Sequence, residues 1–453
     1  MTKGGCRLID GIFYPVTQKK SRKKVKLWVF LLIGFILGNL AFFGQLSASY
    51  VMPTISLAKM FKSGKYLILL QNNSEIRSSG GFIGSFAVLE TENYKIKNLE
   101  FNTNIYALDH EFAKDNHIEG PPPVAKMLKG ESWALRDANY DASFPEAAKD
   151  VMQFYNWETG NEIDGVIALN AQVVVDLLRL VGPVRLDKYD LTVTADNFYR
   201  ETQFQVEKAY YENPENWVIN EPKTILKDMY PILLERAKNQ KLDIYKLIRK
   251  ELAEKEIVLY FSNTSRQAKI EEQNWAGKIP TEMELKSMFA DKQADYLYIN
   301  SNSYSGNKSS ISINQEINYK ISESVDSPGE MLEASLTISR VHAGTNDWPD
   351  GKNTEWMRIF TPVRSELLGA TLNERDVSSK ITTGTEFEKN YFGLEVVTEP
   401  GQANILELKY LIPKFENYQV LIQRQPGVEN TNLQVNYLGN ILFDGLLDRD
   451  LML

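Results

Sequence analysis

Residues 66–90 read YLILLQNNSEIRSSGGFIGSFAVLE, and this stretch sets the predicted fold of the first half of the chain. Its first five residues are apolar and favour a strand, as does the run FIGSFAVLE at residues 82–90. The polar residues between these runs, which include Arg77 and the pair Gly80-Gly81, favour a loop. We therefore expect two strands joined by an arginine-bearing glycine loop, with a third strand at residues 94–101 after a short hairpin connection.

Helical and strand patterns alternate as far as about residue 300. The clearest helix covers residues 170–181, because Asn170 can cap it, apolar residues recur on one face, and Gly182-Pro183 ends it. Further helices are expected at residues 145–155, 194–211, 223–238 and 242–255, with a strand at residues 257–261. This alternation predicts a mixed α/β domain at residues 63–300.

Only strand patterns follow the polar stretch at residues 300–310. Seven runs alternate between apolar and polar residues: 311–321, 331–341, 355–361, 394–398, 404–412, 418–425 and 432–438. Many short strands separated by turn residues are typical of a sandwich. The sequence therefore predicts an all-β, immunoglobulin-like sandwich at residues 310–453, and an α+β fold class for the whole chain.

Composition excludes several classes of protein. The 453 residues include 51 basic and 59 acidic side chains, a net charge of -8, which argues against a nucleic-acid-binding protein because such a protein needs a basic face. One cysteine and three histidines leave no intrachain disulfide and little room for a histidine-rich metal site. No metal ligands are assigned on this basis.

The amino-terminal segment differs from the rest of the chain in charge and hydropathy. Residues 1–46 contain eight basic residues and one acidic residue, and residues 27–46 read LWVFLLIGFILGNLAFFGQL without a charge. Twenty uncharged, mostly apolar residues behind a basic cluster predict a transmembrane helix at residues 27–46 and a basic cytoplasmic tail at residues 1–26. The expected location is the plasma membrane, single-pass, with the bulk of the chain extracytoplasmic in the cell envelope. A cleaved signal peptide is the alternative, since Ser47-Ala48-Ser49 offers small residues for cleavage, but the length of both segments favours an anchor.

Five separated blocks resemble a known bacterial family, the domain of unknown function numbered 4012. They are NNSEIRSSGGFIGSF, RDANYDASFPEAAKD, IDGVIALNAQVVVDLLRLVGPV, DYLYINSNSYSGNKS and YQVLIQRQPG, which begin at residues 72, 136, 163, 295 and 418. The blocks occur in order and cover most of the chain after the apolar segment. The resemblance implies membership of that family and no particular activity.

The order of elements also resembles, more weakly, the LytR-CpsA-Psr group, which transfers glycopolymers from a polyprenyl pyrophosphate carrier to the cell wall. The shared order is an anchor helix, a strand, an arginine-bearing loop, a hairpin, and a helix running into LVGPV at residues 180–184. The resemblance implies a LytR-CpsA-Psr-like α/β domain in which Arg77 binds pyrophosphate. It also implies magnesium, with Glu75, Asp109 and Asp137 as acid or metal partners. The chain departs from that pattern where Asn72 and Asn73 replace a pair of aspartates.

The residues themselves leave two interpretations of this region open. Arg77 and Arg136 could grip phosphate oxygens through paired N–H groups, and Gly80 and Gly81 could direct backbone amides at the same anion. Alternatively, the glycines form a tight turn, and Arg136 and Asp137 form a structural ion pair. The sequence contains no complete catalytic constellation, so catalytic residues stay unassigned.

Two functions follow from these predictions. In the first, the protein binds or transfers a lipid-linked phosphate or glycan, with a polyprenyl-phosphate-linked glycan or a cell-wall polymer as its partner at the membrane. In the second, it is a non-catalytic envelope scaffold or adhesion module that binds a partner through its β-sandwich.

Overall fold

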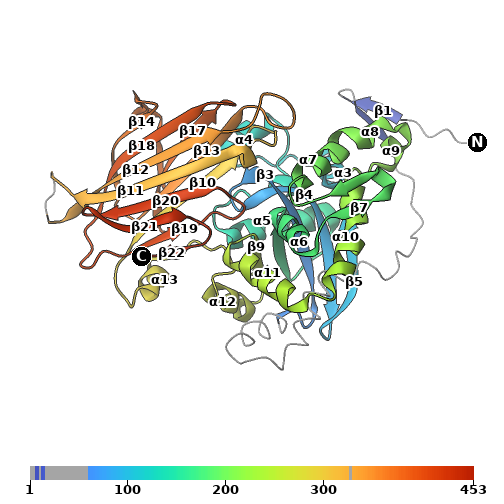
Figure 1. Cartoon of the computed structure of the whole chain (residues 1–453), viewed down its shortest axis with the longest axis horizontal. Coiled ribbons are helices and arrows are strands. Elements are labelled where there is room, and N and C mark those ends of the chain that lie inside the picture. Colours follow the sequence, from blue (N-terminus) through green and yellow to red (C-terminus); the bar gives the residue numbers. More distant parts are fainter. Residues whose placement is uncertain (1–5, 10–11, 16–59, 326–328) are drawn as a thin grey trace, which may run out of the picture. The chain divides into compact units, whose positions relative to one another are not determined.

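The computed structural model describes residues 6–9, 12–15, 60–325 and 329–453 (Figure 1). The chain divides into two compact units. The first unit consists of Met1–Lys65, Ser85–Ala107 and Val174–Leu247, and the second consists of Tyr66–Gly84, Leu108–Val173 and Ile248–Leu453. The predicted boundaries at residues 63, 300 and 310 stay a prediction.

The first unit contains most of the helices in the middle of the chain. They are most of α6 (Gln172–Val181), α7 (Phe198–Phe204), the π-helical turn η3 (Gln205–Ala209), α8 (Tyr210–Glu212), α9 (Pro214–Ile219), α10 (Thr224–Ala237) and the first half of α11 (Lys241–Ala253). Two small antiparallel hairpins accompany them, β1 (Cys6–Ile9) with β2 (Ile12–Pro15), and β7 (Val184–Leu186) with β8 (Leu191–Val193). The four predicted helices of residues 170–255 are confirmed, although the one predicted at residues 194–211 begins at Phe198.

A five-stranded sheet has the order β5-β4-β3-β6-β9. Its strands are β3 (Gly64–Arg77), β4 (Gly80–Glu92), β5 (Lys95–Asn102), β6 (Gly165–Asn170) and β9 (Ile257–Phe261), and β4 runs from the second unit into the first. Strands β3 and β6 pair in parallel, and both carry long buried apolar runs, the pattern of a strand covered on both faces.

The predicted arginine-bearing loop is shorter in the structure than in the sequence analysis. Strand β3 continues through the polar residues 72–77, so only Ser78 and Ser79 form the turn into β4. The polar composition was misleading because Asn73, Ser74, Glu75 and Arg77 are buried, and several of their side chains find partners inside the protein, as described below.

The remaining helices of the second unit lie between the strands in sequence. They are most of α3 (Ile105–Ala113), α4 (Pro122–Leu128), the 3₁₀ turn η1 (Leu135–Asp137), α5 (Phe144–Thr159), the end of α11, α12 (Thr264–Glu272) and α13 (Glu282–Met288). Helix α13 begins with a capping box, in which the Thr281 hydroxyl accepts from the Glu284 amide and the Glu284 carboxylate accepts from the Thr281 amide.

Two further sheets of the second unit pack around one core in the carboxy-terminal half (Figure 1, yellow to red). The six-stranded sheet has the order β16-β17-β13-β10-β19-β22, and the seven-stranded sheet has the order β15-β14-β18-β12-β11-β20-β21. Their strands are β10 (Asp295–Ser303), β11 (Ile313–Glu323), β12 (Met331–His342), β13 (Asn353–Thr361), β14 (Glu366–Leu372), β15 (Arg375–Asp376), β16 (Thr382–Glu386), β17 (Lys389–Thr398), β18 (Ala403–Pro413), β19 (Val420–Gln423), β20 (Thr431–Tyr437), β21 (Asn440–Leu446) and β22 (Leu451–Met452).

The alternation of buried and exposed residues along the strands explains why the two sheets pack face to face. Every second residue of β11, β12 and β18 is buried, and most of the apolar ones join the same core cluster as residues of β10, β13, β17 and β19 from the opposite sheet. The seven predicted strand runs are all confirmed, and the α+β class with a β-rich carboxy-terminal half is confirmed with them. Strand β10 includes the first four residues of the polar stretch at residues 300–310, and all nine residues of the strand are buried.

The predicted location needs correction. Within residues 60–325 and 329–453 and the two short amino-terminal strands, no helix is long and apolar enough to cross a membrane. The predicted transmembrane helix at residues 27–46 lies outside the described residues. This finding contradicts the prediction of a single-pass plasma-membrane protein with an extracytoplasmic bulk, which rested on hydropathy and flanking charge alone, and we drop that prediction.

Candidate functional site

Arg77, the first predicted phosphate ligand, is buried at the end of β3 with only 3% of its surface exposed. Its Nη2 atom lies 2.9 Å from Glu75 Oε1 and 3.1 Å from Asp137 Oδ1, and its Nη1 atom donates to the carbonyl oxygen of Ser303 at 3.2 Å. Burial alone would lower the pKa of Arg77, but Glu75 and Asp137 raise it above its ordinary value. The guanidinium group is therefore charged and already paired with carboxylates.

Arg136, the second predicted phosphate ligand, lies beside Arg77 in the structure. Its Nε atom is 3.2 Å from Asp137 Oδ2, so Asp137 in turn η1 contacts both arginines. The two other amino groups of Arg136 reach Asp109 Oδ2 at 3.3 Å and Glu131 Oε2 at 2.9 Å. Arg136 is thus surrounded by three carboxyl groups.

The sequence analysis missed three residues of this cluster, namely Glu131 and two that are described next. Lys308 forms an ion pair with Glu75, and both Lys308 Nζ and the Arg77 guanidinium lie over the ring of Phe82, at 5.4 Å and 5.1 Å from its centre. Glu158 of α5 accepts a hydrogen bond from the Leu135 amide and shares one with Asp109. We call Glu75, Arg77, Asp109, Glu131, Arg136, Asp137, Glu158 and Lys308 the arginine–carboxylate network. Lys308 is 233 residues from Glu75 in the chain, and no spacing rule could pair them.

The carboxyl groups of this network differ in their affinity for protons. Burial would raise the pKa of Glu75, but the charges of Arg77 and Lys308 hold it below its ordinary value. Burial and the neighbouring Glu158 carboxylate raise the pKa of Asp109 to about 9, although Arg136 opposes them. Asp109 is therefore protonated at neutral pH and donates to Glu158.

This shared proton predicts a pH dependence of stability. The pKa of Asp109 is higher in the folded protein than in the unfolded chain, so its stabilising contribution is complete below about pH 4 and is lost as the pH rises towards 9. The midpoint of urea unfolding should fall across this range, and it should fall less steeply for Asp109→Asn, whose amide keeps its protons. Parallel pH profiles for the two proteins would contradict this prediction.

The predicted anion-binding glycines are in close contact with other chain segments. The Gly81 amide donates to Asn170 Oδ1 at 2.9 Å, and Asn139 Nδ2 donates to the Gly81 carbonyl oxygen at 2.8 Å. A Cβ atom on Gly81 would lie 2.2 Å from the backbone carbon of Asn72, and one on Gly80, whose φ is +135°, would lie 2.2 Å from Gln71 Oε1. These glycines allow close approach of backbones.

The residues implied as magnesium ligands do not fit that ion. Glu75 and Asp137 are both paired with Arg77, and Asp109 is protonated. Within the part of the chain that the structure describes, no group of three or more His, Cys, Asp or Glu residues could hold a metal. Binding of phosphate at Arg77, Arg136, Gly80 and Gly81 stays a prediction, and it would require the anion to displace carboxylates from the arginines.

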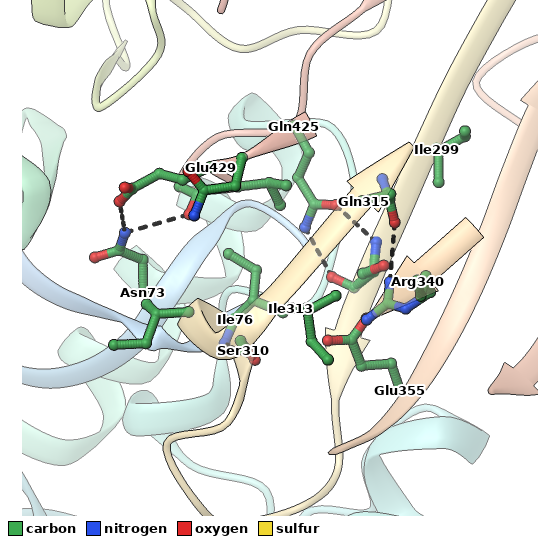
Figure 2. Close-up of a pocket in the computed structure, with 15 residues that line it drawn as sticks. Asn73, Ile76, Ile299, Ser310, Ile313, Gln315, Arg340, Glu355, Gln425 and Glu429 are labelled. Atoms are coloured by element: carbon green, nitrogen blue, oxygen red, sulfur yellow. Dashed lines mark hydrogen bonds and ion pairs between the residues drawn. The ribbon is translucent and has the colours of Figure 1, made fainter. Parts of the chain in front are cut away.

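A small polar cavity lies near one end of the two-sheet core (Figure 2). Its volume is about 40 Å³, and its polar lining includes Asn73, Gln315, Arg340, Glu355 and Glu429. Arg340 reaches Glu355 at 2.7 Å and donates to Gln315 Oε1 at 3.0 Å, while Asn73 donates to Glu429 Oε1 at 2.8 Å. This volume holds about three water molecules, which is too small for a substrate.

The outermost strands β21 and β22 carry a group of exposed apolar side chains. Ile441, Leu442 and Leu446 of β21 are 61%, 40% and 55% exposed, and Met452 of β22 is 53% exposed. Strand β21 ends the seven-stranded sheet and β22 ends the six-stranded sheet, and the strands before them, β20 and β19, share the core. Figure 1 shows β19 to β22 together at the red end of the chain. We call Ile441, Leu442, Leu446 and Met452 the edge patch.

A hollow lies beside β22. It has a volume of about 360 Å³ and is lined by Met288, Phe289, Ala290, Lys292, Gln419, Met452 and Leu453. The methionines are exposed and adaptable, and a volume of this size accepts a large side chain. Exposed apolar side chains on an edge strand and an open hollow are both features that can bind another molecule.

Comparison with known proteins gives a family match for part of the chain. Residues 63–206 match the model of the family described as a protein of unknown function, DUF4012. This match supports the family resemblance drawn from the sequence blocks. The search of curated proteins found no match.

Solved structures show only remote likeness. A Legionella pneumophila protein described as a candidate nutrient-binding protein is 11% identical, with 31% of this chain and 54% of that chain covered, at a TM-score of 0.23. A two-domain M1 zinc metallopeptidase bound to L-tryptophan is 12% identical, with 27% of this chain and 32% of that chain covered, at a TM-score of 0.16. The chain thus spans about half or less of the length of these proteins, and TM-scores this low carry no conclusion about fold or function.

Proposed function

We propose that this protein is a non-catalytic module that binds a protein partner through its β-sandwich. The observation that carries the proposal is the last strand of the seven-stranded sheet, β21, on which the side chains of Ile441, Leu442 and Leu446 are exposed. Met452 of the edge patch lies on the outer face of the other sheet, because it pairs with Leu421, whose side chain packs with Ile279 and Phe289 there. Single exposed apolar residues are common on monomeric proteins, but three of them on one edge strand mark an interaction surface. As part of this proposal, we also infer that the sandwich is immunoglobulin-like.

The charged groups of the second unit support a structural role for the predicted site. Every carboxylate near Arg77 and Arg136 faces one of these arginines, Lys308 or another carboxyl group. Opposite charges in such contacts offset one another and leave little net attraction for an external anion, and the Nε atom of Arg77 is a buried donor without a hydrogen-bond partner among the residues that the structure describes. A role in binding is therefore better sought on the exposed part of the sandwich.

The first functional expectation, binding or transfer of a lipid-linked phosphate or glycan, ranks second. One observation favours it, namely that Arg77 and Arg136 meet at Asp137. The network holds five carboxyl groups and three cations, so its negative charges are at least as many as its positive charges. A phosphate, which is also negative, is therefore disfavoured there. This second candidate function assumes that the α/β region resembles the LytR-CpsA-Psr group.

Affinity purification of the full chain from its source cells tests partner binding. The same protein should co-purify with the parent chain and with Ile405→Lys, and it should be lost with Leu446→Lys. Ile405 is a matched control because it is 45% exposed on the same sheet but lies on β18, between β14 and β12. Equal recovery of the same protein with both variants would contradict a role for the edge patch.

A further inference from the structure

The four outer edges of the sandwich differ in how well they are protected against another strand. An edge strand presents unpaired backbone groups, and proteins protect such edges by making them short, charged or polar. Strand β15 has two residues, Arg375 and Asp376, and β22 also has two. Strand β16 reads TTGTE and has no large apolar side chain. Strand β21 is both long and apolar. Strand β14 (Glu366–Leu372) pairs with β15 only at Thr371 and Leu372, and the register shift between Leu367 and Gly369 makes the rest of that edge irregular.

The side chains of β21 point to defined faces. Phe443 lies opposite Val435 of β20, which is buried, and it packs against the core. Asp444 and Leu446 lie opposite Gln434 and Asn432, which face outward because successive residues alternate between faces. The outer face of β21 therefore presents a carboxylate next to an exposed leucine, and Ile441 beyond them is the most exposed apolar residue of the strand.

Two central pairings of β21 with a second copy of itself are unfavourable. In an antiparallel pair, residues directly opposite each other lie on the same face. Two copies of β21 centred on Asp444 would place two carboxylates opposite each other, which is destabilising. Two copies centred on Phe443 would pair Gly445 with Ile441, and the bulge between Val435 and Asn436 places these two on different faces.

We propose that β21 binds an extended strand of a different protein, which carries a basic side chain opposite Asp444 and apolar side chains on either side of it. This inference rests on the proposed function and names the class of partner. Backbone hydrogen bonds along the free edge supply the affinity, while the alternating side chains supply specificity. The charge of Asp444 selects lysine or arginine at the central position.

A designed peptide tests this inference without knowledge of the natural partner. The probe is the labelled peptide Thr-Val-Thr-Lys-Thr-Val-Thr, and its control has glutamate in place of lysine. Titration of the full chain, followed by fluorescence anisotropy, should show saturable binding of the lysine peptide and binding of the glutamate peptide at least about fivefold weaker. The Asp444→Lys variant should reverse this preference, because it reverses the charge at the centre of the edge.

Variants of exposed residues show where the probe binds. Leu446→Lys should weaken binding of the lysine peptide about tenfold, whereas Ile405→Lys should leave it unchanged. Circular dichroism of each variant should match the parent chain, since neither residue is in the core. No saturable binding up to about 1 mM, or equal affinity for the two peptides, would overturn strand pairing.

Two further outcomes separate this inference from the proposed function. If co-purification is lost in Leu446→Lys but the peptide does not bind, the sandwich binds a partner by another mode and strand pairing is wrong. If light scattering shows a dimer of the full chain that Leu446→Lys dissociates, the edge binds a second copy, and the inference of a different protein is wrong.

Discussion

Replacement of Arg77 by alanine should lower the free energy of unfolding by about 3–5 kcal/mol. The substitution removes the cation that Glu75 and Asp137 share, and both carboxylates are almost fully buried. A carboxylate that is buried without its partner has neither water nor a cation around it. The folded protein is therefore destabilised by the desolvation energy of both carboxylates. Equilibrium unfolding in urea, followed by tryptophan fluorescence, measures the effect.

Arg449→Ala is the matched control for this experiment. Arg449 also belongs to the second unit and pairs with Asp448, but its side chain is 54% exposed. An exposed pair of this kind contributes little, so unfolding should change by no more than about 0.5 kcal/mol. If Arg77→Ala were as stable as the control, the network would not hold the fold, and a ligand-binding role for Arg77 would regain support.

Replacement of Gly81 by alanine should be equally severe, with a loss of at least about 3 kcal/mol or no folded protein at all. A methyl group there would meet backbone atoms of Asn72 and Asn73 at 2.2 and 2.3 Å, and backbone cannot move aside as a flexible side chain can. Thermal unfolding of the purified variant, or its absence from the soluble fraction, gives the answer.

Gly369→Ala serves as the control for Gly81. The nearest atom to a new methyl group at Gly369 is Ser378 Oγ at 3.8 Å, which is ordinary contact. Alanine at this position should leave the free energy of unfolding unchanged, or raise it slightly because alanine restricts the conformations of the unfolded chain. Similar melting temperatures for the Gly81 and Gly369 variants would mean that the glycine pair is not required for close packing.

The sequence predicted the regular elements well because their signals are local. The alternating runs at residues 311–321 and 404–412 became β11 and β18, and the capped apolar pattern after Asn170 became α6. Strand β21 was missed, since its exposed apolar residues at positions 441, 442 and 446 do not alternate as those of a half-buried strand do. A local pattern reports burial, and an edge strand is largely unburied.

The candidate site was predicted in part. The sequence analysis chose Arg77, Arg136, Asp109 and Asp137, and the structure brings all four together. It could not tell an anion site from an ion-pair network, because the deciding partners, Lys308 and Glu158, come from distant parts of the chain. Polar residues 72–77 were expected in a loop for the same reason, since long-range partners allow a buried polar strand.

Amide hydrogen exchange of the full chain, with and without the lysine peptide, tests the central claim most directly. The claim is that binding takes place at the free edge of β21 and leaves the arginine–carboxylate network unchanged. We expect slower exchange at residues 440–446 in the presence of the peptide and no change at residues 75–84. Slower exchange at residues 75–84, with none at residues 440–446, would contradict the account.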